Sequence, residues 1–501
     1  MNSITPERLE KAYAIPKKDE VVKAQKLPVR YHVENGVETE DRPEKFLRAM
    51  AAILKHTNYG FALDHFSRVT AKCARCAVSC PIYEVTGKPE HVPCYRSSML
   101  LDIYRRHFTL GGRIRARITG DIGITDEIIE EMAGSYYDCT ACRRCTNACP
   151  MGIDHGLVTH LGRWILAEIG IVPRALVVST REQISGDTHN TSAIPLPALL
   201  DSLEFMEEEM EGTKNAPVKF PVDQEGAEYL FVAPVSDYMM EAETLMGIAC
   251  VMHATGGSWT IGTKNYDAIN YGLFYSDQVL EKLVNNIEAE AKRLGCTKIL
   301  VGECGHASRS AKFFLNNFSK ICHMPVVNIL EYTHDAMKAG KLTFDKTIVT
   351  EKVTYHDPCN IARPGWVVEQ PREIIREFIP DFVEMTPKGR DNYCCGGGGG
   401  TVSIDEIRPW RTTIGGRKKA EQIDKTGAKI VIAPCANCKK QIRELLEDNE
   451  MPVELVGLHD LIYKALVLSP DGVAWREPEE DDFDWMGGGE EDFKPPEEAK
   501  A

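Results

Sequence analysis

Four cysteines in the first third of the chain have the spacing of a cubane iron–sulfur motif. Cys139, Cys142, Cys145 and Cys149 follow one another as C-x2-C-x2-C-x3-C, and Pro150 comes directly after the last. In such a run three thiolates bind the iron corners of one cluster, and the fourth binds a neighbouring cluster. Structural zinc is the alternative, but zinc sites usually use two separated C-x2-C pairs. The run therefore predicts electron transfer through [4Fe–4S] clusters.

An earlier cysteine group repeats this spacing without its first member. Cys73, Cys76 and Cys80 match the last three positions, and Thr70 occupies the first. Cys94 lies fourteen residues after Cys80 and brings the cysteines of the region to the eight that two [4Fe–4S] clusters need. We expect one cluster on Cys80, Cys139, Cys142 and Cys145, and the other on Cys73, Cys76, Cys94 and Cys149. The alternatives are that Cys94 is a buried thiol, or that its cluster is a [3Fe–4S] or has a non-cysteine ligand.

A third cysteine group, in the C-terminal half, has an unusual pattern. Its members are Cys359, the adjacent pair Cys394-Cys395, Cys435 and Cys438, and five glycines (396–400) follow the adjacent pair. Neighbouring side chains diverge, so both thiols of the pair can reach one metal centre only where the backbone bends sharply and approaches closely, as glycine permits. Five thiolates exceed the four that a cubane needs. The group predicts an atypical cluster with an iron or a sulfur open to substrate.

Alternating strand and helix signals surround this third group. The apolar segments 229–235, 298–301 and 429–433 are predicted strands, which is typical of α/β architecture. Residues 226–465 also look internally duplicated, which predicts two homologous α/β units. Four anchors pair in the same order: APVS (233–236) with DPCN (357–360), HATGG (253–257) with YCCGG (393–397), Cys304 with Cys435, and His334-Asp335 with His459-Asp460.

Composition narrows the class of protein. The 501 residues carry a net charge of −15 and show no basic stripe, which argues against a nucleic-acid partner. Seventeen cysteines, an odd number grouped in C-x-x-C runs, argue against a secreted disulfide framework. We see neither a transmembrane segment nor the apolar core of a signal peptide. We expect a cytoplasmic protein whose membrane association comes from partners.

These signals divide the chain into six parts of an α+β multidomain protein. We expect an N-terminal extension (1–66), a mainly helical ferredoxin-like domain with two [4Fe–4S] clusters (67–182), a linker (183–225), two α/β units (226–345 and 346–470) and an acidic tail (471–501). The tail carries Phe483, Trp485 and Phe493 among carboxylates. It either anchors to a basic surface of a partner or only solubilises the chain.

The third cysteine group resembles the CCG domain of the heterodisulfide reductase family. The order of a ferredoxin-like domain and two CCG units is similar to that of D-type heterodisulfide reductase subunits, over about residues 67–465. The resemblance implies two pseudo-symmetric α/β CCG domains. It also implies a noncubane [4Fe–4S] cluster on Cys359, Cys394, Cys395, Cys435 and Cys438.

The first unit departs from the two-centre members of that family. Val235, Ala254, Thr255 and Ala307 align with Cys359, Cys394, Cys395 and Cys438, and Cys304 alone is retained. We therefore expect one substrate-reducing centre, with Cys304 and His306 facing it as catalytic residues. A buried structural cysteine and a satisfied core histidine are the alternative. His356 is a second possible proton donor.

Three segments (355–363, 392–409 and 433–441) most resemble the DsrK branch, the catalytic subunits of a membrane complex of dissimilatory sulfur metabolism. This implies reduction of a disulfide or trisulfide on a DsrC-type small thiol protein. Electrons would come from quinol through a membrane haem b subunit of DsrM type, on the inner face of the cytoplasmic membrane. One alternative is an electron-transfer subunit of a flavin-dependent 2-hydroxy-acid or glycerol-3-phosphate dehydrogenase. In that case the flavin sits on a partner, because no G-x-G-x-x-G follows a strand here. A zinc-stabilised scaffold is the non-enzymatic alternative.

Overall fold

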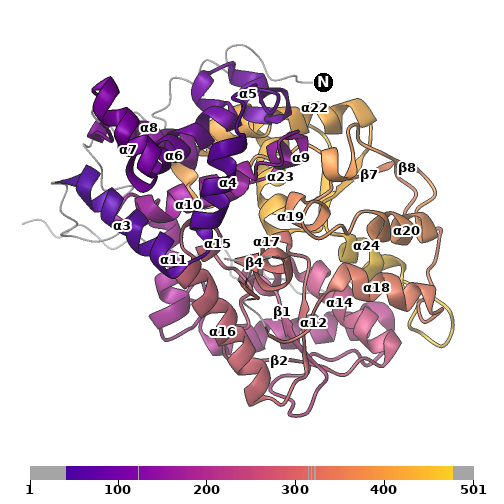
Figure 1. Cartoon of the computed structure of the whole chain (residues 1–501). Helices are drawn as coiled ribbons and strands as arrows, with labels where there is room; N and C mark the ends of the chain where they lie inside the picture. The colour runs from indigo at the N-terminus through magenta and orange to yellow at the C-terminus, as the bar shows by residue number, and fades with distance from the viewer. Residues whose placement is uncertain (1–40, 122, 314, 317–318, 321–322, 478–501) are drawn as a thin grey trace, which may run out of the picture.

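The structure, a computed structural model, describes residues 41–477 except positions 122, 314, 317–318 and 321–322. Most of the expected N-terminal extension and of the acidic tail, including Phe483, Trp485 and Phe493, lies outside the described residues. The described chain combines a helix-rich part with two small parallel sheets and their helices, which agrees with the expected α+β class (Figure 1).

The helix-rich part surrounds one apolar core. On the first helix Phe46, Met50 and Ile53 recur at spacings of four and three, so they share the buried face. Residues 42–66 therefore belong to this domain and are not a separate extension, contrary to the sequence prediction. The main helices are α3 (Arg42–His56), α4 (Tyr59–Val69), α6 (Pro93–Phe108), α8 (Asp126–Tyr137), α10 (His155–Glu168) and α11 (Arg174–Ser185), with the shorter α5 (Pro81–Thr86), α7 (Leu110–Thr119) and α9 (Arg144–Ala148) between them.

Two four-stranded parallel sheets follow, and they have the same topology. The first has the order β2-β1-β3-β6 and the second β8-β7-β9-β10, so each unit places its strands as second, first, third and fourth. This identity supports the predicted duplication. The strands are β1 (Tyr229–Val232), β2 (Trp259–Ile261), β3 (Lys298–Val301), β6 (Val326–Asn328), β7 (Val353–Tyr355), β8 (Phe382–Val383), β9 (Ile430–Ile432) and β10 (Glu454–Val456); β4 (Leu315–Asn316) and β5 (Ser319–Lys320) form a separate antiparallel pair.

Helices connect these parallel strands, as parallel pairing requires. Their bounds are α13 (Val235–Met239), α14 (Ala242–Thr255), α15 (Gly272–Tyr275), α16 (Asp277–Arg293), α17 (Gly305–Ser308) and α18 (Ile329–Lys338) in the first unit, and α19 (Cys359–Ala362), α20 (Glu369–Phe378), α21 (Arg408–Trp410), α22 (Arg417–Thr426), α23 (Ala436–Asp448) and α24 (Leu458–Ala465) in the second.

The structure corrects one anchor of the duplication. HATGG ends α14 and precedes β2, whereas YCCGG lies on the loop after β8. The equivalent loop after β2 reads Asn265-Tyr266-Asp267, which matches Asn392-Tyr393-Cys394. The counterpart of Cys394 is thus Asp267 and not Ala254. Its buried carboxylate accepts the N–H of Val235, the counterpart of Cys359. The first unit still has no thiol at these positions.

A second anchor shifts by one helical turn. Glu331 accepts the N–H of Asn328 at the start of α18, and Asp460 accepts the N–H of Gly457 at the start of α24. These capping positions pair Glu331 with Asp460. The alignment of His334 with His459 is therefore four residues out of register.

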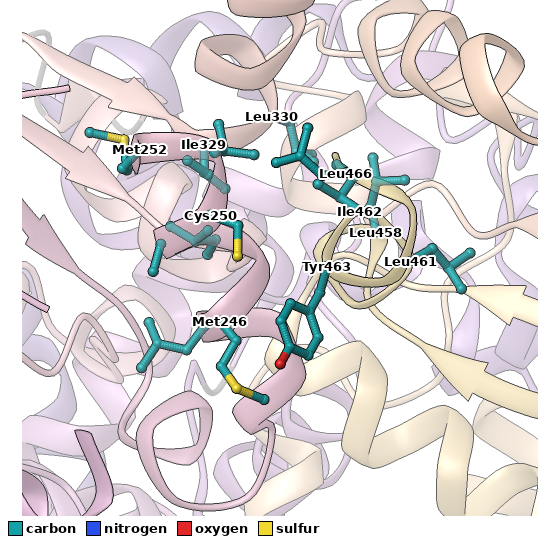
Figure 2. Close-up of a cluster of buried hydrophobic side chains, with 14 of the residues drawn as sticks. Met246, Cys250, Met252, Ile329, Leu330, Leu458, Leu461, Ile462, Tyr463 and Leu466 are labelled. Atoms are coloured by element: carbon teal, nitrogen blue, oxygen red, sulfur yellow. The ribbon is translucent and has the colours of Figure 1, made fainter. Parts of the chain in front are cut away.

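The two α/β units share an interface between α14 and α24. A Cβ on Gly247 would lie 2.0 Å from the carbonyl oxygen of His459, so glycine permits the close approach of the two helices. Figure 2 shows the apolar side chains that fill this interface: Met246, Cys250 and Met252 of α14, Ile329 and Leu330 of α18, and Leu458, Leu461, Ile462, Tyr463 and Leu466 at α24.

The predicted linker is a packed element. Helix α12 (Leu196–Lys214) is nineteen residues long and buries Leu199, Leu203, Met206 and Met210. Their spacings of four, three and four place them on one face, against the core shared by both α/β units. Among the described residues, no helix combines the length and apolar character needed to cross a bilayer.

Candidate iron–sulfur centres

The five cysteines of the third group meet at one edge of the second sheet. Cys359 follows β7, Cys435 follows β9 as the N-cap of α23, and Cys438 lies in the first turn of that helix. Cys394 and Cys395 lie on the loop after β8. The carboxyl ends of parallel strands share one edge, and this is where open α/β sheets bind their ligands. All five thiols are buried.

Contacts between sulfur atoms link these cysteines. The Sγ atoms of Cys395 and Cys438 lie 3.5 Å apart. Cys394 accepts a hydrogen bond from Cys359, and Cys435 contacts Cys438. The structure thus brings together every thiol of the predicted group, and all five are free of disulfides.

The series of contacts continues beyond the group at both ends. Cys394 also accepts a hydrogen bond from Cys142 of the cubane motif. At the other end, Cys435 accepts one from Cys304, which is fully buried in the first α/β unit. An unbroken line of thiol contacts therefore runs from the ferredoxin-like domain, through the third group, to Cys304.

Hydrogen bonding within this line divides its members into donors and acceptors. The thiolate is the form that binds metal, so the acceptors have the character of ligands before any metal is present. Hydrogen bonds to neighbouring sulfurs, followed by burial, raise the pKa of Cys142, Cys304, Cys359 and Cys438. The same bonds lower the pKa of Cys394, Cys395 and Cys435.

Two basic side chains beside these thiols carry no signal in the cysteine spacing. Lys419 of α22 is fully buried, donates to Asn392 Oδ1 over 2.7 Å, and has its pKa lowered by burial to about 7. His356 Nε2 lies 3.4 Å from Cys438 Sγ, and burial lowers the pKa of this imidazole. The ligand atoms of His356, Cys395 and Cys438 lie within 4.8 Å of one another, so His356 is a candidate additional ligand.

The glycine run serves two close approaches. Gly396 has a φ of 103°, which makes the turn after the adjacent cysteines possible, as the sequence predicted. Further along, a Cβ on Gly398 would lie 2.2 Å from the carbonyl oxygen of Thr140, and one on Gly399 would lie 2.4 Å from that of Cys139. The run therefore also docks onto the cubane loop, a contact that the sequence does not reveal.

Three buried arginines fasten the cubane loop to its neighbours. Each donates to a carbonyl oxygen of residues 139–142 and to a second segment, so each is a positively charged bridge close to the cluster thiols. Arg163 binds the carbonyls of Cys139 (2.6 Å) and Gly399 (2.8 Å), Arg309 binds the carbonyl of Ala141 (3.4 Å) and Asn360 Oδ1 (3.1 Å), and Arg363 binds the carbonyls of Cys142 (2.9 Å) and Arg390 (2.9 Å).

The first predicted cubane set lines one cavity. Cys80, Cys139, Cys142 and Cys145 all border it, together with Arg96. Burial raises the pKa of Cys80 to about 11 and, with the neighbouring thiols, that of Cys145 further. These soft thiolate donors, converging on one enclosed space, fit a cubane cluster.

The second set contains a direct contact between Cys76 and Cys94. Cys94 lies in the first turn of α6, where a hydrogen bond from Cys76 and backbone N–H groups, including that of Ala74, lower its pKa to about 6. Cys73 lies three residues before Cys76, and Cys149 ends α9, which packs against residues 77–79. A half-exposed thiol of thiolate character fits a ligand better than an inert buried cysteine.

His306 has a partner at each ring nitrogen. Its Nε2 lies 2.6 Å from the Asn270 carbonyl oxygen, and its Nδ1 lies 3.2 Å from the side-chain amide of Asn437. The ring packs on Phe274, and burial lowers its pKa to about 4. The neutral ring thus positions Asn437, which lies between Cys435 and Cys438.

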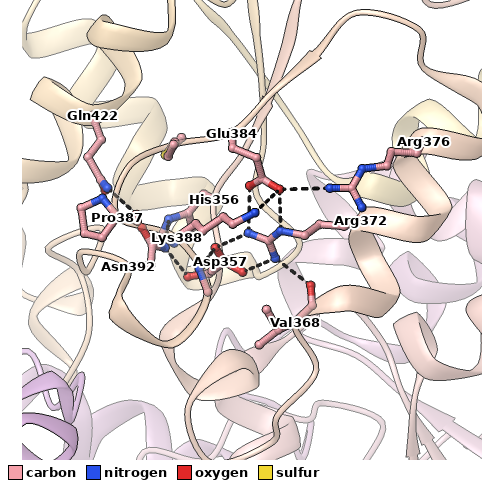
Figure 3. Close-up of polar contacts among 12 residues, drawn as sticks. His356, Asp357, Val368, Arg372, Arg376, Glu384, Pro387, Lys388, Asn392 and Gln422 are labelled. Carbon is pink, nitrogen blue, oxygen red and sulfur yellow. Dashed lines mark hydrogen bonds and ion pairs between the residues drawn. The ribbon is translucent and has the colours of Figure 1, made fainter.

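A buried ion-pair network supports the loop before Cys359 (Figure 3). Arg372 is fully buried and donates to both carboxylate oxygens of Asp357 over 2.8 Å. It also binds Glu384, over 2.8 and 3.1 Å. Asp357 in turn accepts the N–H of Gly389 over 2.7 Å. The network fixes the strand end from which Cys359 projects.

Two regions of the chain match known domain families. Residues 71–153 match the 4Fe–4S dicluster domain, and residues 353–443 match the cysteine-rich CCG domain. These regions contain the two cubane sets and the third cysteine group, respectively.

Among curated proteins, the chain is 29% identical to the Hdr-like menaquinol oxidoreductase iron-sulfur subunit 2 of Archaeoglobus fulgidus, over 91% of this chain and 88% of that protein. It is 25% identical to the D-type polypeptide of the dihydromethanophenazine:CoB–CoM heterodisulfide reductase of Methanosarcina barkeri, over 79% and 93%. It is 23% identical to the EtfAB:quinone oxidoreductase of Syntrophomonas wolfei, over 79% and 57%. The chain thus carries two iron–sulfur domains and is similar to oxidoreductase subunits.

Proposed function

We propose that this protein reduces a disulfide or trisulfide on a DsrC-type small thiol protein at the third cysteine group. Electrons enter from quinol through a membrane haem b subunit and pass two [4Fe–4S] clusters. The line of thiol contacts from Cys142 to Cys304 carries the proposal, because it joins a cubane ligand set directly to the candidate catalytic centre. Similarity to menaquinol oxidoreductase and heterodisulfide reductase subunits supports both ends of this route.

The chemistry sets what the protein must do. Cleaving an S–S bond takes two electrons, and two protons are needed if both products leave as thiols. When bound, a noncubane cluster would supply electrons singly and a site for the cleaved sulfur. The chain's own part is to hold the five thiols dry and to bring positive charge to them. Lys419 and Arg309, both fully buried by their neighbours, supply that charge.

Within this scheme Cys304 is the sixth sulfur of the centre. It lies beside Cys435 and is the retained thiol of the first α/β unit. We assign it a redox role in contact with the centre. His306 takes a positioning role, because both ring nitrogens already have partners and the ring is neutral at pH 7.

A relay function is the second candidate. All five thiols of the third group are at most 8% exposed, which restricts access for a protein-bound sulfur. The similarity to an EtfAB:quinone oxidoreductase also favours passage of electrons between a flavoprotein and quinone. In that case the chain is an electron-transfer subunit of a flavin-dependent dehydrogenase, and no sulfur bond is cleaved.

The discriminating assay uses the cluster-loaded protein with reduced viologen and a synthetic peptide that carries an intramolecular trisulfide. Sulfur reduction predicts viologen oxidation with release of two thiols and sulfide, dependent on the peptide. A matched Cys359→Ser variant should lose this activity and keep both cubane signals. Viologen oxidation by quinone, without any by the peptide, would overturn the sulfur reaction and leave the relay.

A further inference from the structure

Helix α7 turns an apolar face away from the protein. Leu110, Ile114 and Ile118 are 76%, 52% and 79% exposed, and their spacing of four residues places them on one side. Ala116, on the opposite side, is the one α7 residue that the described part of the chain buries. A helix at a water-exposed surface normally has the reverse arrangement. This face is therefore built to be covered.

The stability of α7 points the same way. The helix has ten residues and begins with Gly111 and Gly112, and isolated helices of that length are marginal in water. Gly112 lies close to α6, where a Cβ would meet the Arg105 carbonyl oxygen at 1.8 Å. That contact fixes the position of α7 but buries little apolar surface. A second surface must supply the rest of the stabilisation.

The charge of α7 identifies the chemistry of that second surface. Arg113, Arg115 and Arg117 are exposed along its flanks, and the helix contains no acidic residue, although the chain carries a net charge of −15. A complementary surface has an apolar centre and carboxylates at its rim. Two copies of this chain would place arginines against arginines, which disfavours self-association through this face.

A cavity beside α7 connects this face to a cluster ligand. It has a volume of about 530 Å³ and runs along α6, from Cys94 at one end to Arg106 at the other, with Asp121 and Gly123 just after α7 on its wall. Cys94 is half-exposed, and Cys73 of the same predicted set is exposed. The third cysteine group is buried. The cluster edge nearest to solvent therefore lies beside α7, where a redox partner can approach.

We propose that α7 and the rim of the Cys94 cavity form the docking surface for the electron-donating protein partner, through an apolar patch on that partner ringed by carboxylates. The direction of electron flow rests on the proposed function, whereas the docking does not. A redox protein is favoured over a lipid surface because the cavity leads to a cluster ligand, and lipid brings no electron carrier there.

The test uses the complex purified anaerobically from its own host through a tag on this chain. The Ile114→Glu/Ile118→Glu variant is compared with wild type and with Phe61→Glu, a control at a residue of α4 that is 76% exposed. We measure the haem or flavin that co-purifies per chain, and the cluster EPR signal after reduction by menadiol or by dithionite. The double variant should keep its iron and its dithionite signal. It should lose about tenfold or more of the partner cofactor and of the menadiol-dependent signal, as expected when two central apolar contacts become buried charges.

Three results would overturn the proposal. The first is an unchanged yield of partner cofactor in the double variant. The second is a photo-crosslink from position 114 to residues 1–40 or to a second copy of this chain. The third is α7-dependent binding of the isolated wild-type chain to phosphatidylglycerol vesicles. Viologen-driven sulfur reduction is measured in parallel. Its absence in wild type would overturn the proposed function alone, because it does not require the docked partner.

Discussion

Arg163 and Gly399 join the two redox regions of the molecule. The Arg163 guanidinium donates to the Gly399 carbonyl oxygen over 2.8 Å while it also binds the carbonyl of Cys139. One side chain of α10 thus holds the cubane loop and the glycine run in a fixed relation. Because Cys142 and Cys394 touch across the same boundary, this fastening sets the path between the two centres.

Replacing this arginine should slow electron transfer between the centres. Arg163→Met leaves three carbonyl groups without their donor, at about 1–3 kcal/mol for each buried group that stays unsatisfied. We expect all clusters to assemble, with a weaker magnetic interaction between them and slower reduction of the third group in rapid-freeze EPR. Arg48→Met, at an exposed residue paired with Glu44, is the matched control. Unchanged interaction and rate would exclude the fastening role.

Cys94 should be required for the second cubane cluster. The loaded protein is expected to hold about twelve iron atoms on three four-iron clusters. Cys94→Ser should lower this number by about one in the case of a [3Fe–4S] product, and by about four if the whole cluster is lost. Cys296→Ser, at a buried cysteine of the first α/β unit, is the control. Full iron content with an unaltered EPR spectrum would show that another ligand serves, and zinc without iron would establish the scaffold alternative.

Gly247 should be intolerant of any side chain. A Cβ there meets the backbone of His459, so the α14–α24 interface must open in Gly247→Ala. We expect a loss of about 1–3 kcal/mol in the free energy of unfolding, typical of overpacking. Gly212→Ala, in the exposed part of α12 with free space around it, is the control and should be neutral or stabilising. Urea unfolding followed by circular dichroism measures both, and equal midpoints would contradict the close packing.

Arg372 should be essential to the second unit. Arg372→Met leaves Asp357 buried with an uncompensated charge, which costs about 3–5 kcal/mol when one partner of a buried ion pair is removed. Arg372→Lys retains the charge but loses the paired geometry, so a smaller loss is expected. Arg376→Met, at a half-exposed residue that also reaches Glu384, is the control. Denaturant unfolding gives the three values, and an Arg372→Met protein as stable as this control would refute the structural role of the network.

Much of the site follows from the sequence, because cysteine spacing is a local pattern. The three groups, the α/β alternation and the retained Cys304 all read directly from positions along the chain, and the structure brings these thiols together. The contact of Cys142 with Cys394, the position of Lys419 and the arginine bridges depend on which surfaces meet in space. No local pattern encodes that. The HATGG anchor failed for a related reason: similar small residues occur at a helix end and in a metal loop, and Asp267 took the equivalent position in the fold.

The most direct test of the account is EPR of the cluster-loaded protein, poised at one fixed potential, with and without the trisulfide peptide. Direct sulfur chemistry predicts that the peptide changes the signal of the third cysteine group at constant potential, that Cys304→Ser alters this change, and that Cys296→Ser does not. A signal that responds to potential but not to the peptide would contradict the central claim.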